Sequence, residues 1–473
     1  MARLQSLFAA HDLTKGTPWK RIVQFAVPLL LGNIAQQFYN TADSIVVGRY
    51  IGDNALAAVG SAGPVLHLLL VLFVGIAVGA GIMVSQYFGA KDRQQLSKTI
   101  GTCIVLTAFA SLTIMVVGPM VSRPLLELLN TPPSIIDWCT DYLNIFFLGS
   151  AGFSYYNILA GVLRGLGDSF SALLYLLVAT ILNVVLDIVF VAFFGMGVPG
   201  VALATVVAQA VSAVFCLLRL LKMRDVFDLN WSMLKINREL TRQIIKLGLP
   251  SGLTQAVFSM AMIVVQSLTN SFGEMVIAAN VIIMRVDSFA MMPNFSFGNA
   301  MTTFTGQNMG AKRLDRVEEG TKHGVGIAMG VSAVITVLLI FFGHYLMHVF
   351  TDTPELVDFS VRMLRILAIG YIAVAVTQSL AGVMRGAGDT MTPMWISLIT
   401  TVGLRVPIAY GLAHLSRSEL HPTGRPESVF ISLLISWTLG AAITYAFFKK
   451  GAWKTKSVTS STKREAAAEV SST

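Results

Sequence analysis

Stretch after stretch of this chain is apolar and long enough to cross a lipid bilayer as a helix, which takes about 20 mostly apolar residues. Only 12% of the 473 residues are Asp, Glu, Lys or Arg, whereas soluble domains carry about 25%. The sequence therefore predicts an all-α integral membrane protein with about twelve transmembrane helices. The expected spans are Ile22–Val47, Ala55–Gln86, Thr99–Val121, Ile135–Leu163, Phe170–Phe194, Val201–Leu221, Ile244–Phe272, Val276–Thr305, Thr321–Val349, Phe359–Met384, Met391–Ala413 and Val429–Phe448.

Basic residues cluster in alternate loops, and this pattern sets the expected orientation. The formal net charge is +9, yet the Lys and Arg residues gather before the first span, after the second, in mid-chain and at the end. Cytoplasmic loops carry such an excess. We therefore expect both termini in the cytoplasm, a multi-pass protein of the inner (cytoplasmic) membrane, and no nucleic-acid partner.

The chain repeats itself at a fixed offset. Gln86-Tyr-Phe-Gly-Ala-Lys reappears as Gln307-Asn-Met-Gly-Ala-Lys, and Arg164-Gly-Leu-Gly-Asp-Ser as Arg385-Gly-Ala-Gly-Asp-Thr, each 221 residues later. An even number of helices in each repeat inserts both the same way round, so the repeats form two parallel six-helix bundles, an N-lobe and a C-lobe. The expected divisions are a cytoplasmic segment 1–21, the N-lobe 22–221, a cytoplasmic linker 222–243, the C-lobe 244–448 and a cytoplasmic polar tail 449–473.

These motifs at one offset, in twelve expected spans, resemble the multidrug and toxic compound extrusion (MATE) transporters. The resemblance covers nearly the whole chain. It implies a secondary active multidrug exporter, working by cation (H⁺ or Na⁺) antiport and alternating access. Small amphiphilic, cationic substrates and a lipid bilayer are then its partners, the coupling ion takes the place of a cofactor, and we expect a monomer.

Polar residues inside the expected helices are the candidate sites, because each ionisable group in hydrocarbon costs roughly 2.5–3.5 kcal/mol. Helical spacing puts polar residues of the first span on one face, and Asn183 and Asp187 share a face of the fifth. If the faces converge, two carboxylates, amides and the Thr205 hydroxyl form an oxygen-rich cage suited to Na⁺ or a shuttled proton. The alternative is a hydrogen-bond network that only holds the bundle together.

The resemblance sharpens this prediction to four cation-coupling residues. The archaeal and bacterial DinF-like branch of the family places its coupling carboxylates in helices 1 and 5, with an Asn one turn before the second and a hydroxyl in helix 6. The matching residues are Asp43, Asn183, Asp187 and Thr205. The NorM-like branch has acids in helices 7 and 10, where this chain has none, so coupling through the N-lobe is expected. We expect no metal beyond Na⁺ there.

A second group of polar residues is assigned, as a hypothesis, to the substrate cavity. Its members are Asn33, Gln36, Asn40, Asn157, Gln209, Gln255, Arg285 and Asp287. Arg285 and Asp287 are two residues apart and do not face each other, so partners on other helices are expected, as for Arg405. For these three, we favour an interhelical ion pair or a side chain reaching the interface over a contact with the substrate.

Three other function classes compete with antiport. A flippase for lipid-linked precursors, from the related superfamily, needs a cationic central cavity, for which only Arg285 and Arg405 are candidates. A membrane-embedded enzyme needs a catalytic constellation, and the sequence contains no phosphate loop, nucleophile triad or metal cluster. A channel does not require two homologous lobes, which favour alternating access. We therefore expect a transporter and not an enzyme.

Overall fold

The computed structural model describes residues 12–419 and 421–459, and within them every element is helical apart from one isolated bridge between Ser418 and His421. The all-α prediction is confirmed. The elements are α2 (Pro18–Tyr50), α3 (Asp53–Gly89), α4 (Arg93–Leu128), α5 (Ile136–Leu148), α6 (Ser150–Gly165), α7 (Ser169–Asp187), η1 (Ile188–Phe193), α8 (Gly197–Leu221), α9 (Arg238–Asn270), α10 (Glu274–Gly310), α11 (Leu314–His348), α12 (Pro354–Gly386), α13 (Met391–Leu398), η2 (Ile399–Arg405), α14 (Val406–Leu415), α15 (Glu427–Lys450) and η3 (Ala452–Thr455).

The number of membrane-length helices agrees with the expected twelve spans. In the described part of the chain, nine helices are long and apolar enough to cross a membrane, and α5 with α6 makes a tenth, bent span. The two helices that complete the expected twelve are α2 and α3, whose 33 and 37 residues are long enough to cross a membrane. Most helices extend a turn or more beyond the predicted spans, because polar residues at the interfaces continue the helical hydrogen bonding.

The expected spans are wrong in three internal details. The fourth span is not one straight helix, since it bends by 53° between α5 and α6. The fifth span ends in the π-helix η1, and the eleventh carries the π-helix η2 between α13 and α14. Such π segments interrupt the regular helical face and occur often at functional sites. Apolar periodicity alone does not reveal these breaks.

Two boundaries also differ from the expected divisions. The linker is shorter than predicted, because α9 begins at Arg238. The helix α15 continues to Lys450, and Gly451, with φ of 76°, ends it before η3. Parts of the expected terminal segments, residues 1–11 and 460–473, lie outside the described residues.

Internal contacts divide the described residues into two compact units. Unit 1 contains Asp12 and Val27–Gly252; unit 2 contains residues 13–26 and the chain from Leu253 onward. The start of α2 therefore belongs to unit 2, and the start of α9 belongs to unit 1. These units resemble the expected lobes, but with the first turns of the two leading helices exchanged.

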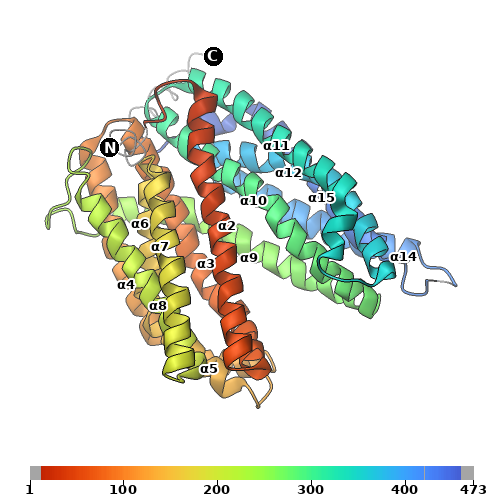
Figure 1. Ribbon diagram of the computed structural model, residues 1–473. Helices are drawn as coiled ribbons and strands as arrows, with labels where there is room; N and C mark the ends of the chain where they lie inside the picture. Colours follow the sequence, from red (N-terminus) through yellow and green to blue (C-terminus); the bar gives the residue numbers. More distant parts are fainter. Residues whose placement is uncertain (1–11, 420, 460–473) are drawn as a thin grey trace. The chain divides into compact units, whose positions relative to one another are not determined.

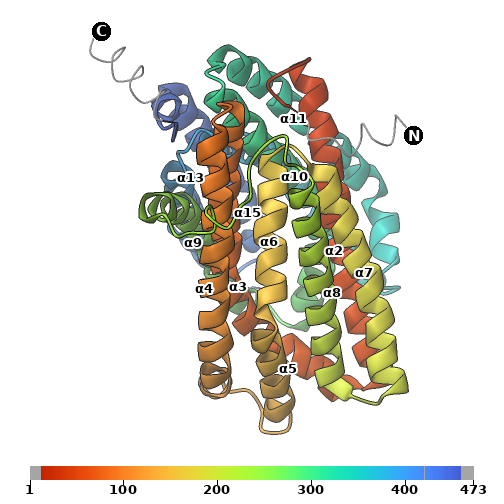
Figure 2. The same cartoon turned by 90° about the vertical axis from the view of Figure 1, so that its left-hand side faces the viewer.

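The helices of unit 1 form a bundle in which α6 packs on α3 and α8, and α7 packs on α8 (Figures 1 and 2). Two glycines of α6, of which Gly165 belongs to the repeated turn motif, bring α6 close to α3. A Cβ at Gly161 would lie 2.9 Å from the Ala77 carbonyl oxygen, and one at Gly165 would lie 2.8 Å from that of Gly81. Only hydrogen fits in the space.

Unit 2 has an equivalent close contact between two helices. The helix α12 packs on α10, α11 and α15, and its Gly382 and Gly386 lie against the backbone of α10 at Gly298 and Thr302. Each of these four residues lies 221 positions after its counterpart in the contact between α6 and α3 of unit 1. The repeated Gly residues therefore set the distance between two helices in each half.

The Arg-Gly-x-Gly-Asp turns begin the next helix in each half. Gly167 and Gly388 have φ of 87° and 100°, a conformation that glycine adopts without steric cost. Asp168 caps α7, accepting hydrogen bonds from Ser171 N at 3.0 Å and Ser171 Oγ at 2.9 Å. Asp168 also accepts a hydrogen bond of 2.9 Å from Arg219 Nε on α8.

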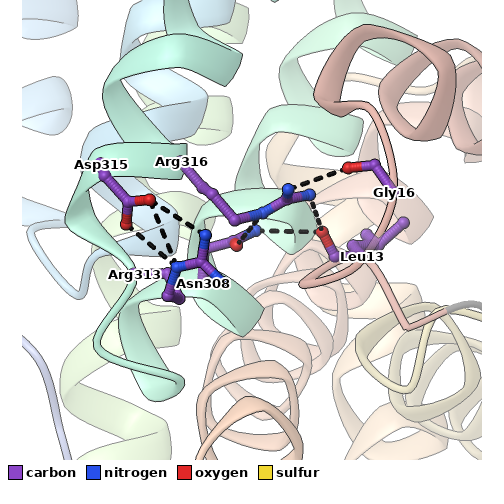
Figure 3. A network of polar contacts seen from close by, with 6 residues as sticks. All are labelled: Leu13, Gly16, Asn308, Arg313, Asp315 and Arg316. Carbon is purple, nitrogen blue, oxygen red and sulfur yellow. Dashed lines mark hydrogen bonds and ion pairs between the residues drawn. The ribbon is translucent and has the colours of Figure 1, made fainter.

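A short segment before α2 is held by the end of α10 and the first turn of α11 (Figure 3). Arg316 donates from its guanidinium to the Gly16 carbonyl at 2.8 Å and the Leu13 carbonyl at 3.2 Å. The Leu13 amide donates to Gln307 Oε1 at 2.9 Å, and Asn308 Nδ2 donates to the Leu13 carbonyl at 3.3 Å. The Gln-x-x-Gly-Ala-Lys motif of the second half thus anchors the chain ahead of α2.

The linker between the halves is fixed to the beginning of α4. Arg93 forms an ion pair with Asp228, with NH2 and Oδ1 2.8 Å apart, and donates to the backbone carbonyls of Asp225 and Arg224. The Asp228 amide donates to Ser97 Oγ at 2.9 Å. The Arg93 guanidinium lowers the pKa of the Asp228 carboxyl group below its ordinary value.

Candidate functional site

Three helices of unit 1 bring the predicted coupling residues together. Oriented with its side-chain nitrogen toward the carboxyl groups, Asn183 donates to Asp43 Oδ1 at 2.7 Å and to Asp187 Oδ2 at 3.2 Å. The opposite end of this amide lies 3.4 Å from Thr205 Oγ1. One Asn side chain from α7 therefore bridges a carboxyl group of α2 with one of its own helix and reaches the hydroxyl on α8.

The site is largely buried and rich in oxygen atoms. Asn183 and Asp187 have no exposed surface, Thr205 is 6% exposed and Asp43 is half-buried. The buried acceptor Asp187 Oδ1 receives no hydrogen bond from any residue that the structure describes, and neither does Gln209 Oε1, one helical turn after Thr205 on α8. Unsatisfied buried oxygen atoms cost free energy, and a cation or a proton would offset that cost.

Two tyrosines complete the site, and the sequence interpretation missed both. Tyr39 is buried beside Asp43 and Thr205, and Tyr142 of α5 lies near both carboxyl groups. Tyr39 is four residues before Asp43, so helical spacing could have found it. Nothing in the sequence marks Tyr142, because it comes from another helix.

The other predicted cavity residues of unit 1 are less uniform. On α2, Asn33 and Gln36 are half-buried and Asn40 is exposed. Asn157 is half-buried, and its Nδ2 donates to the Phe153 carbonyl in its own helix at 2.9 Å. The role of these four residues in substrate binding stays a prediction.

The predicted residues of unit 2 separate into exposed and buried groups. Gln255 on α9 and Arg285 on α10 are exposed, whereas Asp287 is 8% and Arg405 4% exposed. Asp287 interacts with the phenol of Tyr371 on α12 and the guanidinium of Arg405 at the end of η2. Asp287 therefore has its partners on other helices, as expected, and does not face Arg285.

The two units thus differ in the charge that they bury. Arg405 is one residue beyond the position that the 221-residue shift pairs with Asn183. Unit 1 holds two carboxyl groups around an amide there, while unit 2 holds the Arg405 guanidinium together with Asp287. Arg405 NH1 points at Met262 Sδ, 3.4 Å away on α9. A cation fits the first set of groups, whereas the second set already contains a cation paired with its acid.

A family model, MatE, matches the chain twice, over residues 28–189 and 250–411. The chain belongs to the MatE family. The two matched segments cover more than half of the chain, and one lies in each of the repeats found in the sequence. The resemblance to MATE transporters is therefore confirmed, and the protein is a multi-pass membrane transporter of this family.

Curated relatives match this MatE protein almost end to end. It is 30% identical over 446 residues to the probable multidrug resistance protein YpnP of Bacillus subtilis, covering 94% of this chain and 98% of the relative. It is 28% identical over 468 residues to the probable multidrug resistance protein YoeA of the same organism, covering 97% and 99%. The multidrug export protein MepA of Staphylococcus aureus is 23% identical over 377 residues, 79% of this chain and 83% of the relative.

Solved structures of MATE proteins have the same fold. A crystal structure of a MATE protein in the bent conformation superposes with a TM-score of 0.87 at 25% identity, covering 94% of this chain and 98% of that one. A MATE crystal structure in the straight conformation gives a TM-score of 0.86 at 24% identity, with the same coverage. The arrangement of the helices is thus that of the family.

Proposed function

We propose that this MatE protein exports small amphiphilic, cationic molecules across the cytoplasmic membrane in exchange for H⁺ or Na⁺. Its relatives named multidrug resistance or export proteins support the substrate class. The observation that carries the coupling is the Asp43–Asn183–Asp187 cluster, in which one amide bridges two carboxyl groups inside a membrane bundle.

The cluster provides what an antiport site needs. Two carboxyl groups held by one amide repel each other when both are ionised, so a bound cation or a proton stabilises the pair. Thr205 and the unsatisfied oxygen atom of Asp187 supply further ligands. Because the DinF-like branch carries its acids in these positions, we assign the protein to that branch. Coupling then takes place in the N-lobe (22–221), and the C-lobe (244–448) has no equivalent acids in its matching helices.

Alternating access links this site to export. Antiport requires that the protein carry either the cation or the drug across the membrane but not both together, so we infer that cation binding to the cluster from outside favours the state that has released its substrate. The protein then lies in the cytoplasmic membrane with both termini in the cytoplasm. The flippase alternative is not favoured, because the buried Arg405 is balanced by Asp287 and Arg285 is exposed.

The test is substrate efflux from proteoliposomes under an imposed pH or Na⁺ gradient. We expect Asp43→Asn and Asp187→Asn to reduce gradient-driven efflux at least tenfold while substrate exchange without a gradient continues. The matched control is Asp389→Asn, which changes a buried Asp that caps α13 to a residue that caps equally well. Undiminished gradient-driven efflux in both cluster variants would refute the coupling assignment.

The same assay separates the two cations. Efflux that follows a Na⁺ gradient at constant pH identifies Na⁺, and efflux that follows only the pH gradient identifies H⁺. The outcome does not alter which residues form the site.

A further inference from the structure

A cavity of about 540 Å³ opens where the end of α11 meets the beginning of α12, at the opposite end of α11 from the Gly-Ala-Lys turn. It is lined by His344, Asp358, Val361, Arg362 and Arg365. No part of the transport argument uses it. By the orientation expected from the basic loops, this end of the unit faces outward.

The cavity is basic. Arg362 and Arg365 are three residues apart and so share a face of α12. In the part of the chain that the structure describes, neither arginine forms an ion pair, and Arg362 only lies 5.7 Å from the Phe359 ring centroid. The one acid lining the cavity, Asp358, is 75% exposed and has its Oδ1 4.0 Å from His344 Nδ1.

A second histidine adds to the donors beside this cavity. His348 Nε2 lies 3.2 Å from His344 Nε2, so one ring donates a hydrogen bond to the other. Each imidazole ring carries an N–H group that can donate a hydrogen bond to an anion.

The other repeat has the opposite polarity at the same positions. The 221-residue shift pairs these residues with others in unit 1 as follows: His344 with Arg123, His348 with Glu127, Asp358 with Asp137, Arg362 with Asp141 and Arg365 with Asn144. There Arg123 is neutralised within the cluster, by Glu127 at 3.2 Å and Asp137 at 3.0 Å. The repeat therefore does not require a basic cluster here, and the fold tolerates an acidic one.

The position of the cavity indicates what it binds. Arginines at an outward end run against the usual excess of basic residues in the cytoplasm, and guanidinium groups bind phosphate oxygens with strong, charge-assisted hydrogen bonds. Three exposed neighbours on the last turns of α11 are apolar or aromatic: Phe341 is 71%, Tyr345 71% and Val349 77% exposed. Such side chains contact lipid chains and the interface.

We propose that Arg362 and Arg365, with the His344–His348 pair, bind the phosphate of an anionic lipid headgroup in the outer leaflet. The acyl chains then lie against the exposed apolar residues at the end of α11. This site is separate from the coupling cluster, which belongs to unit 1, and it does not depend on the proposed antiport.

The experiment measures lipid retention by native mass spectrometry and thermal protection in detergent, with dioctanoyl-phosphatidylglycerol as the probe. We expect the double variant Arg362→Gln/Arg365→Gln to bind it about tenfold more weakly, as loss of charge-assisted phosphate contacts implies. Asp358→Asn should bind it more tightly, because this removes the one negative charge lining the cavity. That variant also keeps the test valid if the double variant does not fold.

Matched probes and a matched variant separate the alternatives. Arg123→Gln removes a cation at the equivalent position of the other repeat and should leave binding unchanged. Equal protection by dioctanoyl-phosphatidylcholine would refute selection for an anionic headgroup, and equal protection by inorganic phosphate would show a soluble anion as the ligand. Unchanged phosphatidylglycerol binding in both the double variant and Asp358→Asn would overturn the site itself.

Discussion

The two Arg-Gly-x-Gly-Asp turns make a matched pair in which one interaction differs. Asp168 and Asp389 each cap a helix through the residue three positions later, with hydrogen bonds of 2.9–3.0 Å and 2.8–3.3 Å. Of the two, only Asp168 also accepts a hydrogen bond from an arginine, Arg219, at 2.9 Å. The residue 221 positions after Arg219, in the second repeat, is Gly440.

The free-energy cost of each substitution follows from these contacts. Losing a cap costs about 1 kcal/mol, and a hydrogen bond to a charged group contributes about 1.5–3 kcal/mol. Asp389→Ala should therefore lower the free energy of unfolding by about 1 kcal/mol, and Asp168→Ala by about 2.5–4 kcal/mol. The lower part of that range is expected, since the Arg219 side chain is 19% exposed.

The assay is equilibrium unfolding by sodium dodecyl sulfate in mixed micelles, followed by circular dichroism. Asp168→Asn keeps a good capping residue and loses the charge, so it isolates the arginine contribution. A double-mutant cycle with Arg219→Gln should give a coupling energy of about 1–3 kcal/mol. Equal losses in Asp168→Ala and Asp389→Ala, with no coupling in the cycle, would refute the reasoning.

Three further predictions test other contacts. Gly79→Leu should destabilise unit 1 by at least about 1–3 kcal/mol, because a side chain at Gly79 meets the α9 backbone. Gly326→Ala in α11, with open space around it, should cause no loss of stability in the same unfolding assay, since Ala favours a helix interior more than Gly does. Arg316→Gln should speed amide hydrogen exchange in residues 13–17, since it frees two carbonyl groups, and unchanged exchange would contradict the anchor. Since Arg93 lowers the folded-state pKa of Asp228, the stability difference between wild type and Asp228→Asn should be constant above the unfolded pKa of about 4. It should shrink as the pH falls through the folded pKa, and a difference that stays constant throughout the acid titration would argue against the ion pair.

Much of the candidate site could be predicted from the sequence, because the polar residues stand out against apolar helices. Helical spacing placed Asn183 and Asp187 on one face, and the resemblance to the family added Asp43 and Thr205. The structure brings these four together. Tyr142 could not be predicted, since contacts between helices far apart in the chain depend on how each helix is rotated and packed.

The sequence by itself determined that the protein lies in lipid, that its fold is all-α and that it consists of two repeats. The lengths of the apolar segments and the 221-residue offset can be measured along the chain, so they require no knowledge of how the helices pack. The tertiary structure decided where the helices break, that the first turns of α2 and α9 belong to the opposite units, and what each buried charge meets. It also showed that equivalent positions at the ends of two helices form an acidic cluster in one repeat and a basic cavity in the other. The physical reason is that such sites are made between helices, where side chains distant in sequence share one low-dielectric or interfacial environment.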